Sequence, residues 1–108
     1  MERRIEQGIS GITGQIIKKY RPQAIILFGS AAHGSWDRDT SDLDFLVVKS
    51  AVPERSIDRI LELENLIERD IACDFLIYRP EELKERQQLG DPFILSILKE
   101  GKVLYGSA

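Results

Sequence analysis

The stretch AIILFGS, residues 24–30, joins a continuous apolar run to a glycine and a serine. Five consecutive apolar residues predict a β-strand that is buried on both faces, as in the interior of an α/β or α+β domain. Gly29 then lets the backbone turn sharply and approach a ligand closely, and a helical turn beginning there would present N–H groups to a phosphate. The Ser30 hydroxyl would add a donor, unless it only caps the turn. The stretch therefore predicts a core strand that ends at a candidate anion site.

A second stretch, DLDFLVV at residues 42–48, follows a polar segment rich in small residues and predicts the next strand. Side chains two positions apart on a strand point to the same side, so Asp42 and Asp44 would share one face while Leu43 takes the other. Two ionised carboxylates repel each other, and a divalent cation relieves that repulsion. Oxygen ligands suit Mg²⁺, which keeps waters and substrate phosphates in its remaining positions. The pair predicts a metal site, with an ordinary polar turn leading into a strand as the alternative.

Asp74 interrupts a third apolar run, residues 71–78, which predicts another strand. A charge inside an apolar strand is costly unless it is paired or bound to a cation. If this strand lies beside residues 43–48, Asp74 joins the earlier carboxylate pair on one face; the alternative is an edge-strand carboxylate that faces water. Together with the Gly29-Ser30 turn, three such carboxylates suit phosphoryl or nucleotidyl transfer, where catalysis consists mainly of positioning and charge neutralisation.

Four segments have the sequence features of helices. Isoleucines at helical spacing mark the first, which ends at Arg21-Pro22 because proline disfavours helix in the residue before it. Proline followed by an acidic residue predicts helix starts at Pro53 and Pro80, and Asp91-Pro92 predicts an N-cap and the first residue of the last helix. The residues expected to face the core are Ile5, Ile9, Ile12 and Ile16 in the first helix, Ile57, Ile60, Leu61 and Ile67 in the second, and Phe93, Ile94, Ile97 and Leu98 in the last.

Length and composition limit the functions open to the chain. Its 108 residues have the size of one ordinary domain, and the order α-β-β-α-β-α-α-β, with a short last strand at residues 103–105, predicts a single α/β or α+β domain over residues 1–108. The net charge of −3 argues against direct nucleic-acid binding and against an anionic-membrane surface. One cysteine, Cys73, in an apolar run, no apolar stretch near the roughly 20 residues of a membrane span, and no signal-peptide pattern predict a cytoplasmic protein.

Three other motifs fail on residue identity. Residues 29–34 have the glycine spacing of a P-loop, but Ser35-Trp36 stands where Lys and then Ser or Thr are required. Residues 37–48 begin like a calcium loop, yet they lack glycine at the sixth position and glutamate at the twelfth. A serine or cysteine hydrolase would need His33, the only histidine, as its base, and the chain has no Gly-x-Ser-x-Gly elbow. We interpret His33 as a solvent-facing residue of the turn.

The motifs LFGS at residues 27–30, Ala32, Gly34 and SDLDFLV at residues 41–47 together resemble the signature of the DNA polymerase β-like nucleotidyltransferase superfamily. Within that superfamily the chain is similar to the minimal nucleotidyltransferases (MNT) that act as antitoxins beside HEPN-domain toxins. The similarity extends over nearly the whole chain. It implies the polymerase β-like palm fold, a small mixed β-sheet flanked by helices.

The resemblance also implies a role for each motif residue. Gly29 and Ser30 would bind the triphosphate of ATP, and Asp42 and Asp44 would hold the metal, two Mg²⁺ ions. Asp74 would be a third metal ligand or the base for the acceptor hydroxyl. The implied reaction is transfer of AMP from ATP to a tyrosine of the HEPN-domain partner toxin, in a type VII-like toxin–antitoxin pair. Such a toxin is usually a ribonuclease, and the two proteins would form a hetero-oligomer.

The polar segment between the two motifs departs from the family pattern. His33 stands where members often carry a basic residue, and eleven residues separate Ser30 from Asp42, one more than is common. Either departure could alter phosphate handling. Within the segment, Trp36 is expected to pack the loop against the domain or to stack on adenine, and Arg38 to reach a phosphate or to remain solvated.

Two other functions are compatible with the sequence. A binding-only antitoxin would block its partner sterically, and substitution of Asp42 and Asp44 by Asn would then leave neutralisation intact. A small-molecule nucleotidyltransferase, like the aminoglycoside-modifying relatives, would turn over a free aminoglycoside, although so short a chain offers no evident pocket for that acceptor.

Overall fold

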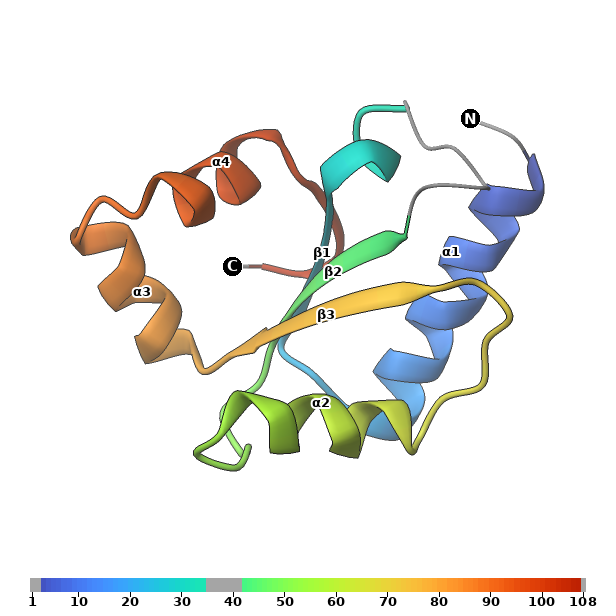
Figure 1. The fold of residues 1–108 in the computed structure, drawn as a ribbon, viewed down its shortest axis with the longest axis horizontal. Coiled ribbons are helices and arrows are strands. Elements are labelled where there is room, and N and C mark those ends of the chain that lie inside the picture. The colour runs from blue at the N-terminus through green and yellow to red at the C-terminus, as the bar shows by residue number, and fades with distance from the viewer. Residues whose placement is uncertain (1–2, 35–41, 108) are drawn as a thin grey trace.

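The computed structural model describes residues 3–34 and 42–107, which form a four-stranded mixed sheet flanked by helices (Figure 1). The elements are α1 (Arg3–Gln15), the π-helix η1 (Ile16–Tyr20), β1 (Ala24–Phe28), the 3₁₀ helix η2 (Gly29–Ala31), β2 (Leu43–Val48), α2 (Ser56–Glu64), β3 (Cys73–Tyr78), α3 (Pro80–Gln88), α4 (Pro92–Glu100) and β4 (Lys102–Gly106). The predicted α+β fold class is confirmed, and every predicted strand is present within two residues of its expected bounds. Within the described ranges, no helix is long and apolar enough to cross a bilayer.

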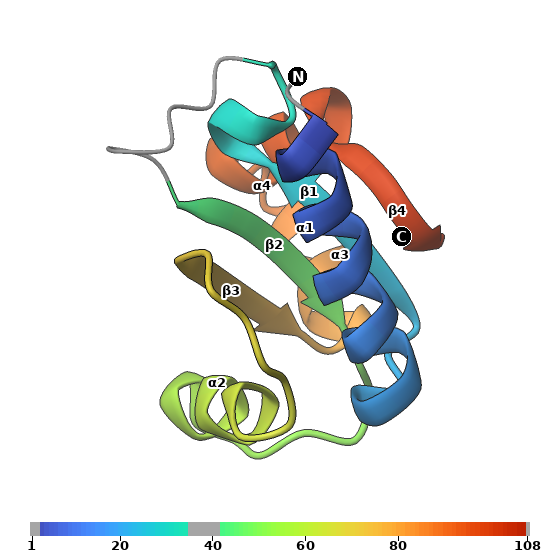
Figure 2. The ribbon, with the colours of Figure 1, turned by 90° about the vertical axis from the view of Figure 1, so that its right-hand side faces the viewer.

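The strands are ordered β3-β2-β1-β4, so that β3 and β4 form the two edges of the sheet (Figure 2). β1 is antiparallel to both of its neighbours, and β2 is parallel to β3. A parallel pair needs a long crossover connection, which here contains α2. The parallel pairing is important for function, because it places the starts of β2 and β3 side by side.

The alternation of side chains along the strands divides the sheet into two faces. Leu27 and Phe45 belong to the core under α1 and α2, whereas Ile26 and Leu46 belong to the core under α3 and α4. Figure 1 shows these two pairs of helices on opposite sides of the sheet. Because Asp44 lies two residues before Leu46 on β2, its side chain is on the α3–α4 face.

The first helix confirms the sequence prediction at both its apolar side and its end. The four isoleucines at helical spacing are all buried. The chain continues from α1 into η1, and Arg21 then adopts a left-handed conformation with φ 59°. Its N–H donates to the carbonyl of Ile16 at 3.1 Å, which ends the helix just before Pro22. The π-helical last turn was not predicted, because the apolar spacing does not distinguish it from an α-helical turn.

The second helix differs from the sequence prediction in its start and in its buried side. α2 begins at Ser56, three residues after the predicted Pro53. Ile57 and Leu61 were expected to face the core, but they are 54% and 49% exposed. The buried positions of this helix are instead Arg59, 3% exposed, and Leu63. An arginine takes a core-facing position here because its guanidinium finds carbonyl and carboxylate acceptors, which an apolar-periodicity argument cannot anticipate.

The last helix confirms the predicted N-cap and corrects one residue of its buried side. Asp91 accepts hydrogen bonds from the N–H groups of Phe93 and Ile94 at 3.0 and 3.3 Å. Ile94 and Ile97 are buried as predicted. Phe93 was predicted to face inward but is 54% exposed. Its ring meets that of Phe28 edge to face, with centroids 5.9 Å apart, so that only one side of the ring is covered.

Tyr20 is buried at the end of η1, and within the described residues its hydroxyl has no hydrogen-bond partner. Burial and the charge of Glu62 raise the pKa of Tyr20 to about 12. We expect Tyr20→Phe to raise the free energy of unfolding by about 1 kcal/mol, because a buried, unsatisfied hydroxyl is destabilising by roughly that amount. Urea denaturation at pH 7 measures the change.

The pH dependence of stability and a control variant show whether the change comes from the Tyr20 hydroxyl. In the unfolded state the pKa of Tyr20 is near 10.0, below its folded pKa, so the wild type loses stability as the pH rises from 10 to about 12. The Tyr20→Phe variant should lack this alkaline loss, and Tyr105→Phe, at an exposed position, should behave like the wild type. A loss of stability in Tyr20→Phe at pH 7 would contradict the prediction.

Candidate functional site

Strands β2 and β3 bring the predicted acidic residues together at one end of the sheet. Asp44 lies directly opposite Asp74 in the parallel register, and Asp42 is the residue before β2. The two strands are therefore neighbours, which is the condition under which Asp74 was expected to join the other two carboxylates. Asp44 is half-buried, whereas Asp42 and Asp74 are exposed. The alternative for Asp74, an edge-strand carboxylate that faces water, also holds, because β3 is an edge strand and Asp74 is exposed. This position places Asp74 beside the other two carboxylates.

The three carboxylates act on one another electrostatically. The pKa of Asp44 is raised by burial, and then by the charges of Asp74 and Asp42. The pKa of Asp74 is also raised, by partial burial and by Asp42, whose side chain is within hydrogen-bonding contact. Mutual repulsion of this kind disfavours three negative charges in one place, and a bound cation would favour them.

The carboxylates fit a hard divalent cation by their chemistry and their placement. Within residues 3–34 and 42–107, no three acidic, histidine or cysteine side chains are arranged to hold a metal ion. The fit to a cation therefore rests on donor chemistry and on the positions of the residues in the strands, and not on a closed set of ligands. Asp42, Asp44 and Asp74 supply only oxygen donors on one face of two adjacent strands, which is the donor set that Mg²⁺ prefers. These are the residues that would hold it.

The Gly29 turn lies directly against this carboxylate group. Gly29 has a φ of +72°, and a Cβ atom added there would overlap Oδ2 of Asp44 and lie 3.2 Å from its Cγ. The backbone of η2 therefore passes beside the carboxylate of Asp44, an approach that the absence of a Cβ permits; the predicted approach to a ligand stays a prediction. Ser30 is the second residue of η2, and Phe28 occupies the N-cap position, so Ser30 is not the cap.

Gly29→Ala should be more destabilising than the same change at Gly34. Both glycines have a left-handed backbone, φ +72° and +74°, which is unfavourable by about 1–2 kcal/mol for a residue with a Cβ. Only Gly29 has Asp44 in the space that the Cβ would occupy; nothing lies within 4 Å at Gly34. The difference in free energy of unfolding between the two variants, measured by urea denaturation, gives the destabilisation caused by the clash with Asp44. Equal losses would show that the turn does not press against Asp44.

A small cavity of about 140 Å³ opens beside the turn, between η2 and α4. Its lining includes Phe28, Gly29, Phe93 and the pair formed by His33 and Glu100, whose side chains approach to 3.4 Å. His33 is exposed in the turn, as predicted.

Sequence reasoning missed Glu100 and the exposed ring of Phe93, because neither has a motif and both reach the turn only through tertiary packing. The predictions for Trp36 and Arg38 lie outside the described residues.

Comparison with known proteins agrees with this arrangement. The family model described as polymerase beta, nucleotidyltransferase, matches residues 13–108. A crystal structure of a provisionally named nucleotidyltransferase from Sulfolobus solfataricus is similar to this chain, with a TM-score of 0.60 and 21% identity over 98% of this chain and 89% of that one. At this identity the likeness shows the fold alone. No curated protein matches the chain significantly. Because the family model spans nearly all of the sequence, the chain belongs to the polymerase beta nucleotidyltransferase family.

Proposed function

We propose that this chain is a Mg²⁺-dependent nucleotidyltransferase that transfers AMP from ATP to a tyrosine of a HEPN-domain partner toxin, and so acts as an MNT-type antitoxin. The observation that carries the proposal is the position of Asp44, which lies opposite Asp74 in the sheet and directly against the backbone of Gly29. A phosphate cradle beside a group of carboxylates is the arrangement that nucleotidyl transfer requires.

In the proposed reaction, the tyrosine oxygen attacks the α-phosphorus of ATP. The bond from that phosphorus to the oxygen bridging the β-phosphate breaks, and pyrophosphate leaves. Gly29 and Ser30 in η2 would bind the triphosphate, and Asp42 and Asp44 would hold two Mg²⁺ ions. Asp74, exposed beside both, would accept the phenolic proton or serve as a third ligand. Bound Mg²⁺ supplies neutralisation of the phosphate charge.

The surroundings of the site favour a macromolecular acceptor. Asp74 lies on the open edge of the sheet, where a large acceptor can approach. A protein tyrosine is therefore a better acceptor for this site than a free aminoglycoside, and turnover of an aminoglycoside would contradict that choice.

Intact-mass analysis tests the proposal. The chain is incubated with Mg-ATP and the product of its neighbouring gene, the proposed HEPN-domain partner. The expected result is a gain in the partner's mass equal to one or more AMP units, which disappears when EDTA removes the divalent metal. No gain in a preparation shown to bind ATP would overturn the transfer reaction. Neutralisation of the toxin without any gain would identify the chain as a binding-only antitoxin.

A further inference from the structure

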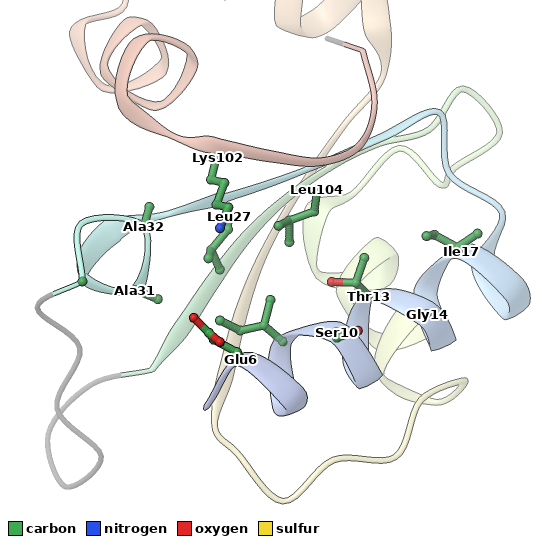
Figure 3. Close-up of a pocket in the computed structure, with 12 residues that line it drawn as sticks. Glu6, Ser10, Thr13, Gly14, Ile17, Leu27, Ala31, Ala32, Lys102 and Leu104 are labelled. Carbon is green, nitrogen blue, oxygen red and sulfur yellow. The ribbon is translucent and has the colours of Figure 1, made fainter. Parts of the chain in front are cut away.

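A groove lies on the opposite face of the sheet from the carboxylates, between α1 and the edge strand β4 (Figure 3). Two cavities of about 740 and 560 Å³ lie along it, and Ile17 lines both. We call it the α1–β4 groove; its characteristic residues are Thr13, Gly14, Ile17, Lys102, Leu104 and Tyr105. In Figure 3, Leu104 projects from β4 toward the side chains of α1.

β4 offers backbone groups along this groove. It is the outermost strand at its edge of the sheet, and it pairs with β1 alone among the described strands. Val103 and Tyr105 on it are 56% and 39% exposed. An exposed edge strand presents unpaired N–H and C=O groups that can pair with an extended segment of another chain. The edge and the adjoining groove together provide both backbone pairing and room for side chains.

Thr13 adds an unsatisfied polar group to the groove. Its side chain is 9% exposed, and its hydroxyl has no hydrogen-bond partner within residues 3–34 and 42–107. A helical threonine commonly bonds to the carbonyl one turn earlier, and this one does not. Threonine has two accessible χ1 rotamers in a helix, so rotation can present the hydroxyl to a group that enters the groove.

The border of the groove is cationic, although the whole chain has a net charge of −3. Lys18, Arg21 and Lys102 line its cavities, and none of them takes part in an ion pair within the described residues. Glu6 is the one acidic residue in the described lining. A second copy bound through the same groove would place like charges opposite these three, which disfavours that pairing and favours an acidic partner.

We propose that the α1–β4 groove binds an extended acidic segment of a partner protein. The segment adds to β4 as a further strand and inserts alternate apolar side chains between α1 and β4, while its carboxylates pair with Lys18, Arg21 and Lys102. The groove and the carboxylate group lie on opposite faces of the sheet, and Ala31 and Ala32 beside Ser30 line one part of the groove. The test below measures peptide binding alone, so its outcome does not depend on the transfer reaction.

A capped synthetic heptapeptide that alternates Ile or Val with Glu or Asp serves as the probe. The expected result is saturable binding to the isotope-labelled chain, with NMR shifts concentrated at the backbone amides of β4 and at α1. The same peptide with Lys in place of the acidic residues should not bind, and N-methylation of alternate amides should weaken binding at least about tenfold, because it removes the strand pairing. No shifts at β4 up to about 1 mM peptide would overturn the proposal.

Two glycines of α1 provide a matched pair of variants. A Cβ at Gly11 or at Gly14 meets nothing within 4 Å, so a side chain can start at either position without a clash, but only Gly14 lines the groove. We expect Gly14→Leu to weaken peptide binding at least about tenfold by filling the groove, and Gly11→Leu to leave it unchanged. Equal losses of peptide binding in the two variants would contradict the proposal. So would a dimer of the chain, seen by sedimentation, that Gly14→Leu disrupts.

Discussion

Asp44→Asn is expected to reduce the rate of AMP transfer by about 10³-fold or more, the effect of losing several kcal/mol of charge stabilisation at a metal-assisted site. Asp44 is central to the group, because it contacts the Gly29 backbone and lies opposite Asp74. The amide keeps the size of the side chain but removes the charge that would hold the cation. Single-turnover transfer from labelled ATP to the partner protein measures the change.

The stability of the Asp44→Asn variant distinguishes a catalytic role from a structural one. Because the folded pKa of Asp44 is raised, its charged form is disfavoured in the folded state, and the neutral amide should leave stability at pH 7 unchanged or higher. Glu81→Gln, an exposed site on α3, makes the same change in net charge and should retain full activity. Full activity of Asp44→Asn would show that the carboxylate has no catalytic role. Lost activity together with a lowered Tm would indicate a structural role instead.

Arg59→Ala is expected to lower the free energy of unfolding by about 3 kcal/mol or more. The guanidinium is buried and donates to the carbonyls of Pro53, Ile77 and Glu54 at 2.6, 3.1 and 3.2 Å. It also forms a bidentate pair with Glu82, at 2.7 and 3.1 Å. The side chain thus ties the segment before α2 to β3 and α3, and its removal leaves several acceptors without a donor. Urea denaturation at pH 7 gives the difference.

Control substitutions identify the burial of Arg59 as the cause. Arg55, four residues earlier in the chain, pairs with Asp58 at 2.9 Å but is exposed, so Arg55→Ala should leave stability nearly unchanged. Arg59→Lys should rescue little, because lysine cannot reproduce the planar set of donors. Losses of similar size in Arg55→Ala and Arg59→Ala would contradict the assignment.

The pH dependence of stability provides a second check on Arg59. The hydrogen bond from Arg59 lowers the pKa of Glu82, so this pair contributes stability above the unfolded pKa of the glutamate, and the contribution is lost as the pH falls through the folded pKa. The wild type should therefore lose stability on acidification over that range. The Arg59→Ala variant should show a weaker loss, because its Glu82 lacks the main cause of the lowered pKa.

Much of the fold and of the candidate site is predictable from local sequence. The strand of residues 24–28 is identifiable because five consecutive apolar residues have no exposed side, and Gly29 because a sharp turn follows them. Asp42 and Asp44 share a face by the period of a strand. Asp74 is conspicuous because a carboxylate stands in an apolar run. Each of these inferences depends on a few neighbouring residues, whose chemistry sets the backbone conformation.

Other features were decided only by tertiary structure. The chain alone determined a buried strand, a glycine turn and three aspartates, because period and composition act over a few residues. It did not determine that Asp44 would lie opposite Asp74, that Arg59 rather than Ile57 would be buried, or that α1 would leave a groove beside β4. Those outcomes depend on which strands pair and on where distant carbonyls and carboxylates satisfy a buried charge. Such contacts join residues far apart in the sequence, and no local pattern contains them.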